Sequence, residues 1–207
     1  MKTLGILGGM GPWATLNFFE EILKNTEAEK DWDHLHIIID NNVQIPSRTR
    51  ALLYNETSPV SAMKDACYNL MRCGCDYIAV PCNSAHYFYD EVVENTNIPW
   101  VNMLQVVSKQ VAHYKTVLVL GGYTTIVKKT YDQYLDNTIY LDNYDMIYDL
   151  IESVKVNKHG YKKKLKFPEA DCVLLACTEL PLVLNYGIDA GKIYVRELIK
   201  LCGGKVK

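Results

Sequence analysis

The stretch CDYIAVPCNSAH, residues 75–86, contains an apolar run that leads through a proline into a cysteine, Cys82. A short apolar run bounded by turn residues is typical of a buried β-strand. The stretch ADCVLLACTEL, residues 170–180, repeats the arrangement, with an aspartate, an apolar run and, at the same spacing, Cys177. We infer that the two cysteines occupy corresponding strand ends in different parts of one chain.

The chain also repeats a glycine pair. LGILGGMGPWAT (residues 4–15) and VLVLGGYTTIVKKT (residues 117–130) each contain an apolar strand, Gly-Gly and the start of a helix. The order along the chain is therefore glycine pair, cysteine, glycine pair, cysteine. Matched elements in the same order indicate an internal duplication.

A duplication of this kind predicts two pseudo-symmetric lobes. We expect the first lobe to span residues 1–100 and the second residues 115–195, and segment 195–207 could pack back on the first lobe. A pseudo-twofold relation would place Cys82 and Cys177 opposite each other, with the active site in the cleft between the lobes.

Apolar runs alternate with helical patterns along the chain. We expect strands at Leu4–Leu7, His36–Ile39, Tyr77–Val80, Trp100–Asn102, Val117–Leu120 and Val173–Ala176, with a further one at Ile193–Val195. Helical periodicity predicts helices at Thr15–Asn25, Ser58–Arg72, Ser84–Asn95, Leu104–His113, Ile126–Tyr134, Tyr144–Val154 and Leu180–Tyr186. This alternation indicates an α/β fold in which each lobe is a mostly parallel sheet flanked by helices.

Charge and hydropathy narrow the class of protein. The formal net charge is −2, so nothing global favours nucleic acid or a membrane surface. The basic run Lys162–Lys166 is short and is interpreted as a solvated loop. No apolar run approaches the roughly 20 residues of a transmembrane helix, and the N-terminal MKTLGILGG is interpreted as a first strand rather than a signal peptide. We expect a cytoplasmic protein.

Seven cysteines are present, and their number is odd. Without a secretory signal, a disulfide framework is not expected. Cys73-Gly-Cys75 has no second cysteine pair or histidine pair beside it, so no metal site is expected either. Most cysteines are interpreted as small core residues, whereas the placement and duplication of Cys82 and Cys177 indicate a function.

Both functional cysteines are expected beyond the carboxyl ends of parallel strands, where such sheets bind ligands. The N–H groups of the following helices favour an anion there and would lower the pKa of each thiol. Two facing thiols could form a redox disulfide, bind a metal, or act on opposite faces of one carbon. The absence of a CxxC pair and of nearby metal ligands favours the third, in which one thiolate removes a proton and the other thiol returns one.

The glycine-rich segment GILGGMGP, residues 5–12, is not a dinucleotide fingerprint. It lacks the GxGxxG spacing, and an acidic residue at the expected distance is missing because Asp40 lies too far along. The glycines are interpreted as allowing backbone N–H groups to approach a carboxylate closely.

Together these motifs resemble the aspartate/glutamate racemase superfamily, specifically its aspartate racemase and broad-specificity amino-acid racemase branch. The resemblance lies in GILGGMGP (5–12), NNVQIPSRT (41–49), PCNSAH (81–86) and ACTEL (176–180), in order over most of the chain. It implies two α/β lobes, a homodimer, no cofactor and no metal, and a small amino acid as the substrate.

The resemblance also assigns residues. It implies that Cys82 and Cys177 are the catalytic thiols, and that the substrate-binding residues are Met10, Arg48, Asn83, Ser84, Thr125, Lys155 and Thr178. The family directs Asn83, Ser84 and Thr178 at the α-carboxylate and Arg48 at the distal carboxylate. Its Gly-Thr-x-x-Thr pattern reads Gly121-Gly122-Tyr123-Thr124-Thr125 here, so only Thr125 keeps its match.

Three assignments have structural alternatives. Lys155 matches a lysine that the family directs at the substrate, but it could equally interact with the dipole of its own helix. His86 could orient the loop or the substrate. Glu179 could assist a thiol or cap a helix.

The sequence thus predicts a cofactor-independent racemase that interconverts the L and D forms of an acidic amino acid, with aspartate ahead of glutamate. Two alternatives stay open. One is a related isomerase or decarboxylase that acts on a small dicarboxylate, and the other is a catalytically weak amino-acid-binding homologue.

Overall fold

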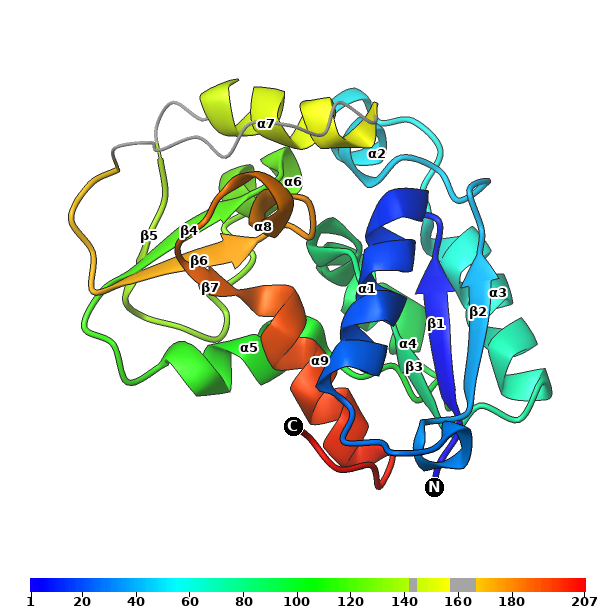
Figure 1. Ribbon diagram of the computed structural model, residues 1–207. Coiled ribbons are helices and arrows are strands. Elements are labelled where there is room, and N and C mark those ends of the chain that lie inside the picture. The colour runs from blue at the N-terminus through cyan, green and yellow to red at the C-terminus, as the bar shows by residue number, and fades with distance from the viewer. Residues whose placement is uncertain (142–144, 157–166) are drawn as a thin grey trace.

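The structure, a computed structural model, describes residues 1–141, 145–156 and 167–207. It contains two parallel β-sheets, one with the strand order β2-β1-β3 and the other with the order β5-β4-β6-β7 (Figure 1). The strands are β1 (Leu4–Gly8), β2 (Ile37–Asn41), β3 (Tyr77–Ala79), β4 (Val117–Gly121), β5 (Thr138–Ile139), β6 (Cys172–Ala176) and β7 (Ile188–Asp189).

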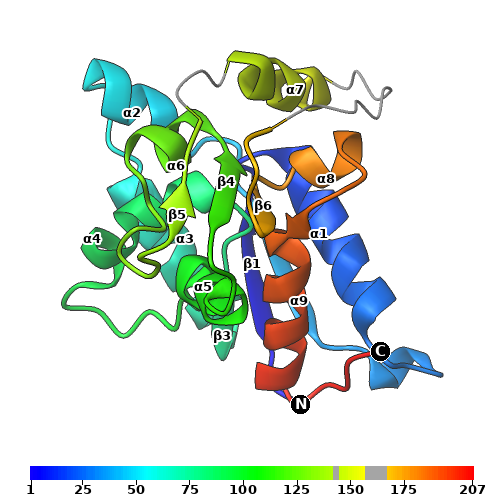
Figure 2. The ribbon, with the colours of Figure 1, turned by 90° about the vertical axis from the view of Figure 1, so that its left-hand side faces the viewer.

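Helices flank both sheets. The α-helices are α1 (Pro12–Asn25), α2 (Arg48–Tyr54), α3 (Val60–Arg72), α4 (Tyr89–Val93), α5 (Met103–Val111), α6 (Tyr123–Val127), α7 (Asp145–Lys155), α8 (Leu180–Val183) and α9 (Ala190–Leu201), and the 3-10 helices are η1 (Asp31–Asp33) and η2 (Asn83–Phe88). Figure 1 shows α2 and α7 beyond the arrowheads of the strands, and Figure 2 shows both chain termini at the opposite end of the molecule.

The central strands β1 and β4 are buried along their whole length, because helices cover both faces of each sheet. A central core joins the two sheets: apolar residues of β1, β4 and β6 pack in one cluster with residues of α1, α5 and α9. A second cluster fills the space between the first sheet and α3, and a third fills the space between the second sheet and α7 and α8. The shared central core fixes the position of one sheet relative to the other.

The α/β fold with two parallel sheets flanked by helices confirms the predicted fold class. The predicted lobe limits, residues 1–100 and 115–195, stay a prediction. The chain after α9 lies against the first half of the molecule: the backbone N–H of Lys207 donates to the carbonyl of Asn25 at 2.9 Å, and Val206 forms an antiparallel bridge with Thr26.

Several predicted elements are wrong or shorter than expected. Ile193–Val195, predicted as a strand, lies within α9, because Asp189 caps that helix through hydrogen bonds from the backbone N–H groups of Gly191 and Lys192. Trp100–Asn102 makes only a single parallel bridge, between Trp100 and Ile78, because Asn102 already caps α5.

The helix predicted at Ile126–Tyr134 begins earlier and ends at Val127 as α6, since Lys129 has the left-handed φ of 45°. The predicted helix Ser84–Asn95 is divided into η2 and α4. The predicted Tyr144–Val154 helix corresponds to α7, although Tyr144 lies outside the described residues, as does the basic run Lys162–Lys166. Within the described ranges, no helix has the length and apolar character needed to cross a membrane.

Candidate active site

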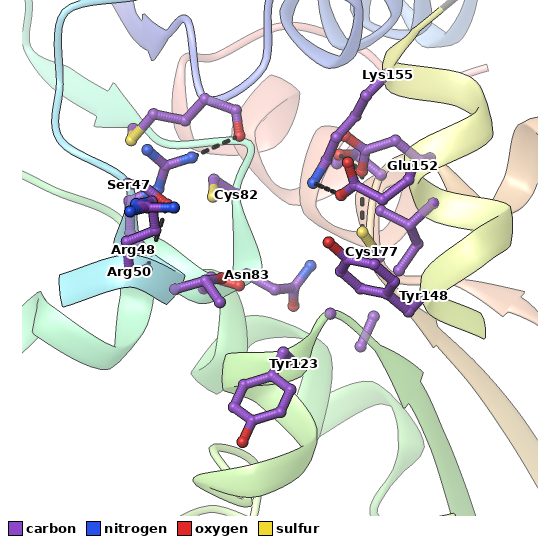
Figure 3. A pocket seen from close by; sticks show the side chains of 18 of the residues that line it. Ser47, Arg48, Arg50, Cys82, Asn83, Tyr123, Tyr148, Glu152, Lys155 and Cys177 are labelled. Atoms are coloured by element: carbon purple, nitrogen blue, oxygen red, sulfur yellow. Dashed lines mark hydrogen bonds and ion pairs between the residues drawn. The ribbon is translucent and has the colours of Figure 1, made fainter. Parts of the chain in front are cut away.

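A cavity of about 620 Å³ opens where the carboxyl ends of the two sheets meet α2 and α7 (Figure 3). This volume is typical of small-molecule sites, which run from roughly 300 to 1,000 Å³. Both halves of the chain contribute to its wall. The lining residues are Met10, Ser47, Arg48, Thr49, Arg50, Leu53, Tyr54, Cys82, Asn83, Ser84, Gly122, Tyr123, Tyr148, Ile151, Glu152, Lys155, Ala176, Cys177, Thr178 and Glu179.

Cys82 enters the cavity from the first sheet. It follows β3 after Val80 and Pro81 and occupies the N-cap position of η2, and its side chain is almost fully buried. The next two residues, Asn83 and Ser84, also line the cavity. One turn therefore presents a thiol, an amide and a hydroxyl to the same space.

Cys177 enters from the second sheet, directly after β6, and Figure 3 shows it on the side of the pocket opposite Cys82. Its thiol donates a hydrogen bond to Oε2 of Glu179 at 2.9 Å, and the Thr178 hydroxyl donates to the same oxygen at 3.0 Å. Burial, the negative charge of Glu179 and this hydrogen bond raise the pKa of Cys177 well above its ordinary value, although the backbone N–H of Glu179 and the charge of Lys155 act the other way.

The expectation that the helix N-terminus lowers the pKa of Cys177 is therefore wrong for this state of the protein. The backbone N–H groups after β6 do favour a thiolate, but the carboxylate two residues later outweighs them. Glu179 itself is buried, and among the described contacts its carboxylate accepts from both Cys177 and Thr178. The raised pKa thus favours the protonated thiol of Cys177.

Lys155, the last residue of α7, lies on the same side as Cys177. Its ammonium group donates to Oε1 of Glu152 at 2.6 Å. Burial lowers the pKa of Lys155, but the hydrogen bond and charge of Glu152, with smaller attractions to Cys177 and Glu179, raise it overall. Because an ammonium group has three N–H donors, Lys155 can keep its hydrogen bond to Glu152 and still donate to a ligand in the cavity.

Arg48 occupies the wall near Cys82 (Figure 3) and is the first residue of α2, whose N-cap is Ser47. Nη1 donates to the carbonyl of Pro46 at 3.0 Å and Nη2 to the carbonyl of Met10 at 3.3 Å. Its Nε is buried without a hydrogen-bond partner, and no carboxylate of the described residues pairs with the side chain. A guanidinium has five N–H donors, so Arg48 is anchored and still has donors for an anion.

Two of the residues predicted for the site do not line this cavity. Thr125 is fully buried and packs against the end of β4: a Cβ atom built on Gly121 would lie 3.0 Å from Cγ2 of Thr125. His86 is buried behind the Cys82 turn, where its Nε2 donates to the carbonyl of Val80 at 3.1 Å. Burial lowers the pKa of His86 to about 4, so the ring is neutral and holds the chain that leads to Cys82.

The other predicted residues do meet at the cavity: Met10, Arg48, Cys82, Asn83, Ser84, Lys155, Cys177, Thr178 and Glu179. Sequence reasoning missed the rest of the α7 wall, formed by Tyr148, Ile151 and Glu152. Tyr148 precedes Ile151 and Glu152 by three and four positions, and Lys155 follows Ile151 and Glu152 by four and three. Helical periodicity therefore places them on one helix face with Lys155. Within the described ranges, no group of three or more His, Cys, Asp and Glu side chains is arranged to hold a metal ion.

Comparisons with known proteins identify the family of this chain. Residues 7–157 match the family model for Asp/Glu/Hydantoin racemase. The aspartate racemase of Picrophilus torridus has a similar structure, with a TM-score of 0.86, 32% identity and coverage of 100% of this chain and 96% of that one. A broad specificity amino-acid racemase of Bacillus subtilis (strain 168) is 27% identical over 201 residues, which cover 88% of each chain.

An aspartate racemase homologue from Pyrococcus horikoshii OT3 shares the fold, with a TM-score of 0.72 at 21% identity, over 98% of this chain and 100% of that one. The match of the family model extends over most of the chain and includes the Cys82 turn and α7. The chain belongs to the Asp/Glu/hydantoin racemase family.

Proposed function

We propose that this protein interconverts the L and D forms of an acidic amino acid, aspartate in preference to glutamate, by proton transfer at the α-carbon, with Cys82 and Cys177 as the acid and base on its opposite faces. One observation carries the proposal: thiols from the ends of two different sheets line opposite sides of one cavity. Inversion of a carbon by proton transfer needs an acceptor on one face and a donor on the other. No cofactor is part of the proposal.

The proton transfers in this scheme balance without a further reactant. One thiolate takes the α-proton, and the electron pair of the C–H bond moves toward the α-carboxylate. The opposite thiol then gives its proton to the other face of the same carbon and becomes the thiolate. Because the raised pKa of Cys177 favours its protonated form, we assign Cys82 as the base for one enantiomer, and the reverse direction begins with the proton on Cys82.

The α-proton of an amino acid is only weakly acidic, so the charge that develops on the carboxylate must be stabilised. The Cys82 turn supplies the Asn83 amide and the Ser84 hydroxyl on one side. The Thr178 hydroxyl stands on the other side, and its single O–H would turn from Glu179 to the bound carboxylate. Fixed donors in a water-poor site stabilise such charge strongly. We assign these residues to the α-carboxylate.

Two cations favour an acidic substrate. Arg48 has guanidinium donors that no described carboxylate uses, and a guanidinium matches a carboxylate in geometry and charge. Lys155 stands on the opposite wall with Glu152. We assign Arg48 to the distal carboxylate of the substrate and Lys155 to a second contact with it. We extend the proposal to a homodimer, which the family resemblance implies, and to a cytoplasmic location.

The direct test removes each thiol in turn. Cys82→Ser and Cys177→Ser should each slow aspartate racemisation by about 10³-fold or more. A serine hydroxyl is a far weaker acid than a thiol, and it is not ionised near neutral pH to take the α-proton. Cys73→Ser is the matched control because Cys73 is exposed and lies outside the cavity. Optical rotation of L- and D-aspartate measures the rate. Near-normal turnover in either site variant, or a wild-type protein that binds aspartate without inverting it, would overturn the proposal.

The role of Arg48 is tested by substrate preference. Arg48→Gln should lower kcat/KM for aspartate by about 100-fold, because a charged hydrogen bond to the distal carboxylate contributes on the order of 1.5–3 kcal/mol. The loss for alanine, which has no distal carboxylate, should stay below about threefold. Arg50→Gln is the control, since Glu56 already neutralises Arg50 through contacts to Nε and Nη2. Equal losses for both amino acids would contradict the assignment.

The proton on Cys177 is tested through its neighbour. Glu179→Gln removes the negative charge that disfavours the thiolate, so the pKa of Cys177 should fall and alkylation at a fixed pH should become faster. The measurement uses the Cys82→Ala background, so that Cys177 is the site thiol that reacts. Modification of Cys177 by iodoacetamide is followed by mass spectrometry at a series of pH values. Glu152→Gln, which removes a carboxylate that pairs with Lys155 rather than with the thiol, should change the pKa far less. An unchanged or higher pKa in Glu179→Gln would refute this account.

A further inference from the structure

Tyr131 connects the second half of the molecule to the residue next to Cys82. It lies in the turn after α6, and its hydroxyl donates to Oδ1 of Asn83 at 2.7 Å. Tyr131 is fully buried and Asn83 is 5% exposed, so the bond lies out of solvent. Hydrogen bonds between buried side chains fix the orientation of both partners.

The bond determines which way the Asn83 amide faces. With Oδ1 engaged by Tyr131, Nδ2 is buried without a hydrogen-bond partner in a residue that lines the cavity. Figure 3 shows the Asn83 side chain between Cys82 and Cys177. A buried N–H donor that lacks a partner is costly, and a carboxylate in the cavity would supply the acceptor.

The reverse orientation of the amide is disfavoured. It would leave the buried phenolic hydrogen of Tyr131 without an acceptor and would turn a carbonyl oxygen toward an anionic ligand. Burial also raises the pKa of Tyr131, so the phenol keeps its proton over the whole working pH range. The hydroxyl is therefore a permanent donor to Asn83.

We propose that Tyr131 is a positioning residue that holds the Asn83 amide N–H toward the substrate carboxylate bound between Cys82 and Cys177. The inference rests on the proposed function for the identity of that carboxylate. The orientation of Asn83, next to Cys82, then depends on Tyr131 from the second half of the chain. Tyr131 does not line the cavity, and its hydroxyl donates to Asn83, so it acts through Asn83.

The experiment removes one hydroxyl group at a time. Tyr131→Phe should lower kcat/KM for aspartate by about tenfold and weaken binding of the dicarboxylate succinate, measured by calorimetry, by a similar factor. Tyr134→Phe is the matched control: its hydroxyl also pairs with an asparagine, accepting from Nδ2 of Asn102 at 2.9 Å, but neither residue lines the cavity. This control should stay within about twofold in both measurements, while thermal unfolding shows comparable losses of stability for the two variants.

A double-mutant cycle separates positioning from a general loss of structure. Asn83→Ala should lose at least as much as Tyr131→Phe, and the double variant should lose no more than Asn83→Ala. Asn83→Asp, tested against wild-type Tyr131, keeps an acceptor for the hydroxyl but lacks the N–H donor. Because it also adds a negative charge, it should bind succinate at least as weakly as Asn83→Ala. Tighter binding than Asn83→Ala would contradict the role of the amide N–H even if Tyr131→Phe fails to fold.

The outcomes also separate this inference from the proposed function. If the wild-type protein binds succinate but racemises nothing, and Tyr131→Phe weakens that binding, the positioning role holds while the racemase proposal fails. Wild-type binding and turnover in Tyr131→Phe, or additive losses in the double variant, would overturn the inference.

Discussion

Parallel strand pairing is the constraint on which the site depends. In a parallel sheet all strands end at the same edge, so whatever follows β3 lies beside whatever follows β1, and the same holds for β6 and β4. The central core of α1, α5 and α9 joins the two sheets so that both carboxyl edges face one cavity. A cysteine placed after one strand of each sheet then reaches a shared space without any special loop.

The two sides of the cavity are chemically different despite their similar construction. The Cys82 side carries Arg48, anchored to the backbone by Met10 and Pro46. The Cys177 side carries a carboxylate that accepts a hydrogen bond from the thiol. This asymmetry favours the protonated thiol at Cys177, although the proposed proton transfers are the same for the two enantiomers.

The sequence predicted those features that depend on short local patterns. Apolar runs and the residues after them identified β1, β3, β4 and β6, and with them the positions of both cysteines. The sequence also contains a helix cap that contradicts one predicted strand: Asp189 accepts from two backbone N–H groups at the start of α9, so the apolar triplet Ile193–Val195 is helical. Likewise Ser47 caps α2 and turns Arg48 into a helical residue.

Features that arise from long-range packing could not be read from the sequence. The helix after β4 ends because Lys129 adopts a left-handed conformation that no glycine signalled, and this turn carries Tyr131 to Asn83. Thr125 kept the family match but is used to pack against Gly121. The raised pKa of Cys177 depends on the orientation of Glu179, which a motif alone does not specify.

The central claim is that two thiols bracket one carbon, and isotope partitioning during the first turnovers tests it most directly. L-aspartate is incubated with the protein in deuterium oxide, and the α-hydrogen content of the L and D pools is followed at low conversion by NMR after chiral separation. The account predicts D-aspartate that carries deuterium from the first turnovers, while the remaining L-aspartate keeps its protium. D-aspartate that retains the substrate hydrogen, or L-aspartate that exchanges without forming the D enantiomer, would contradict it.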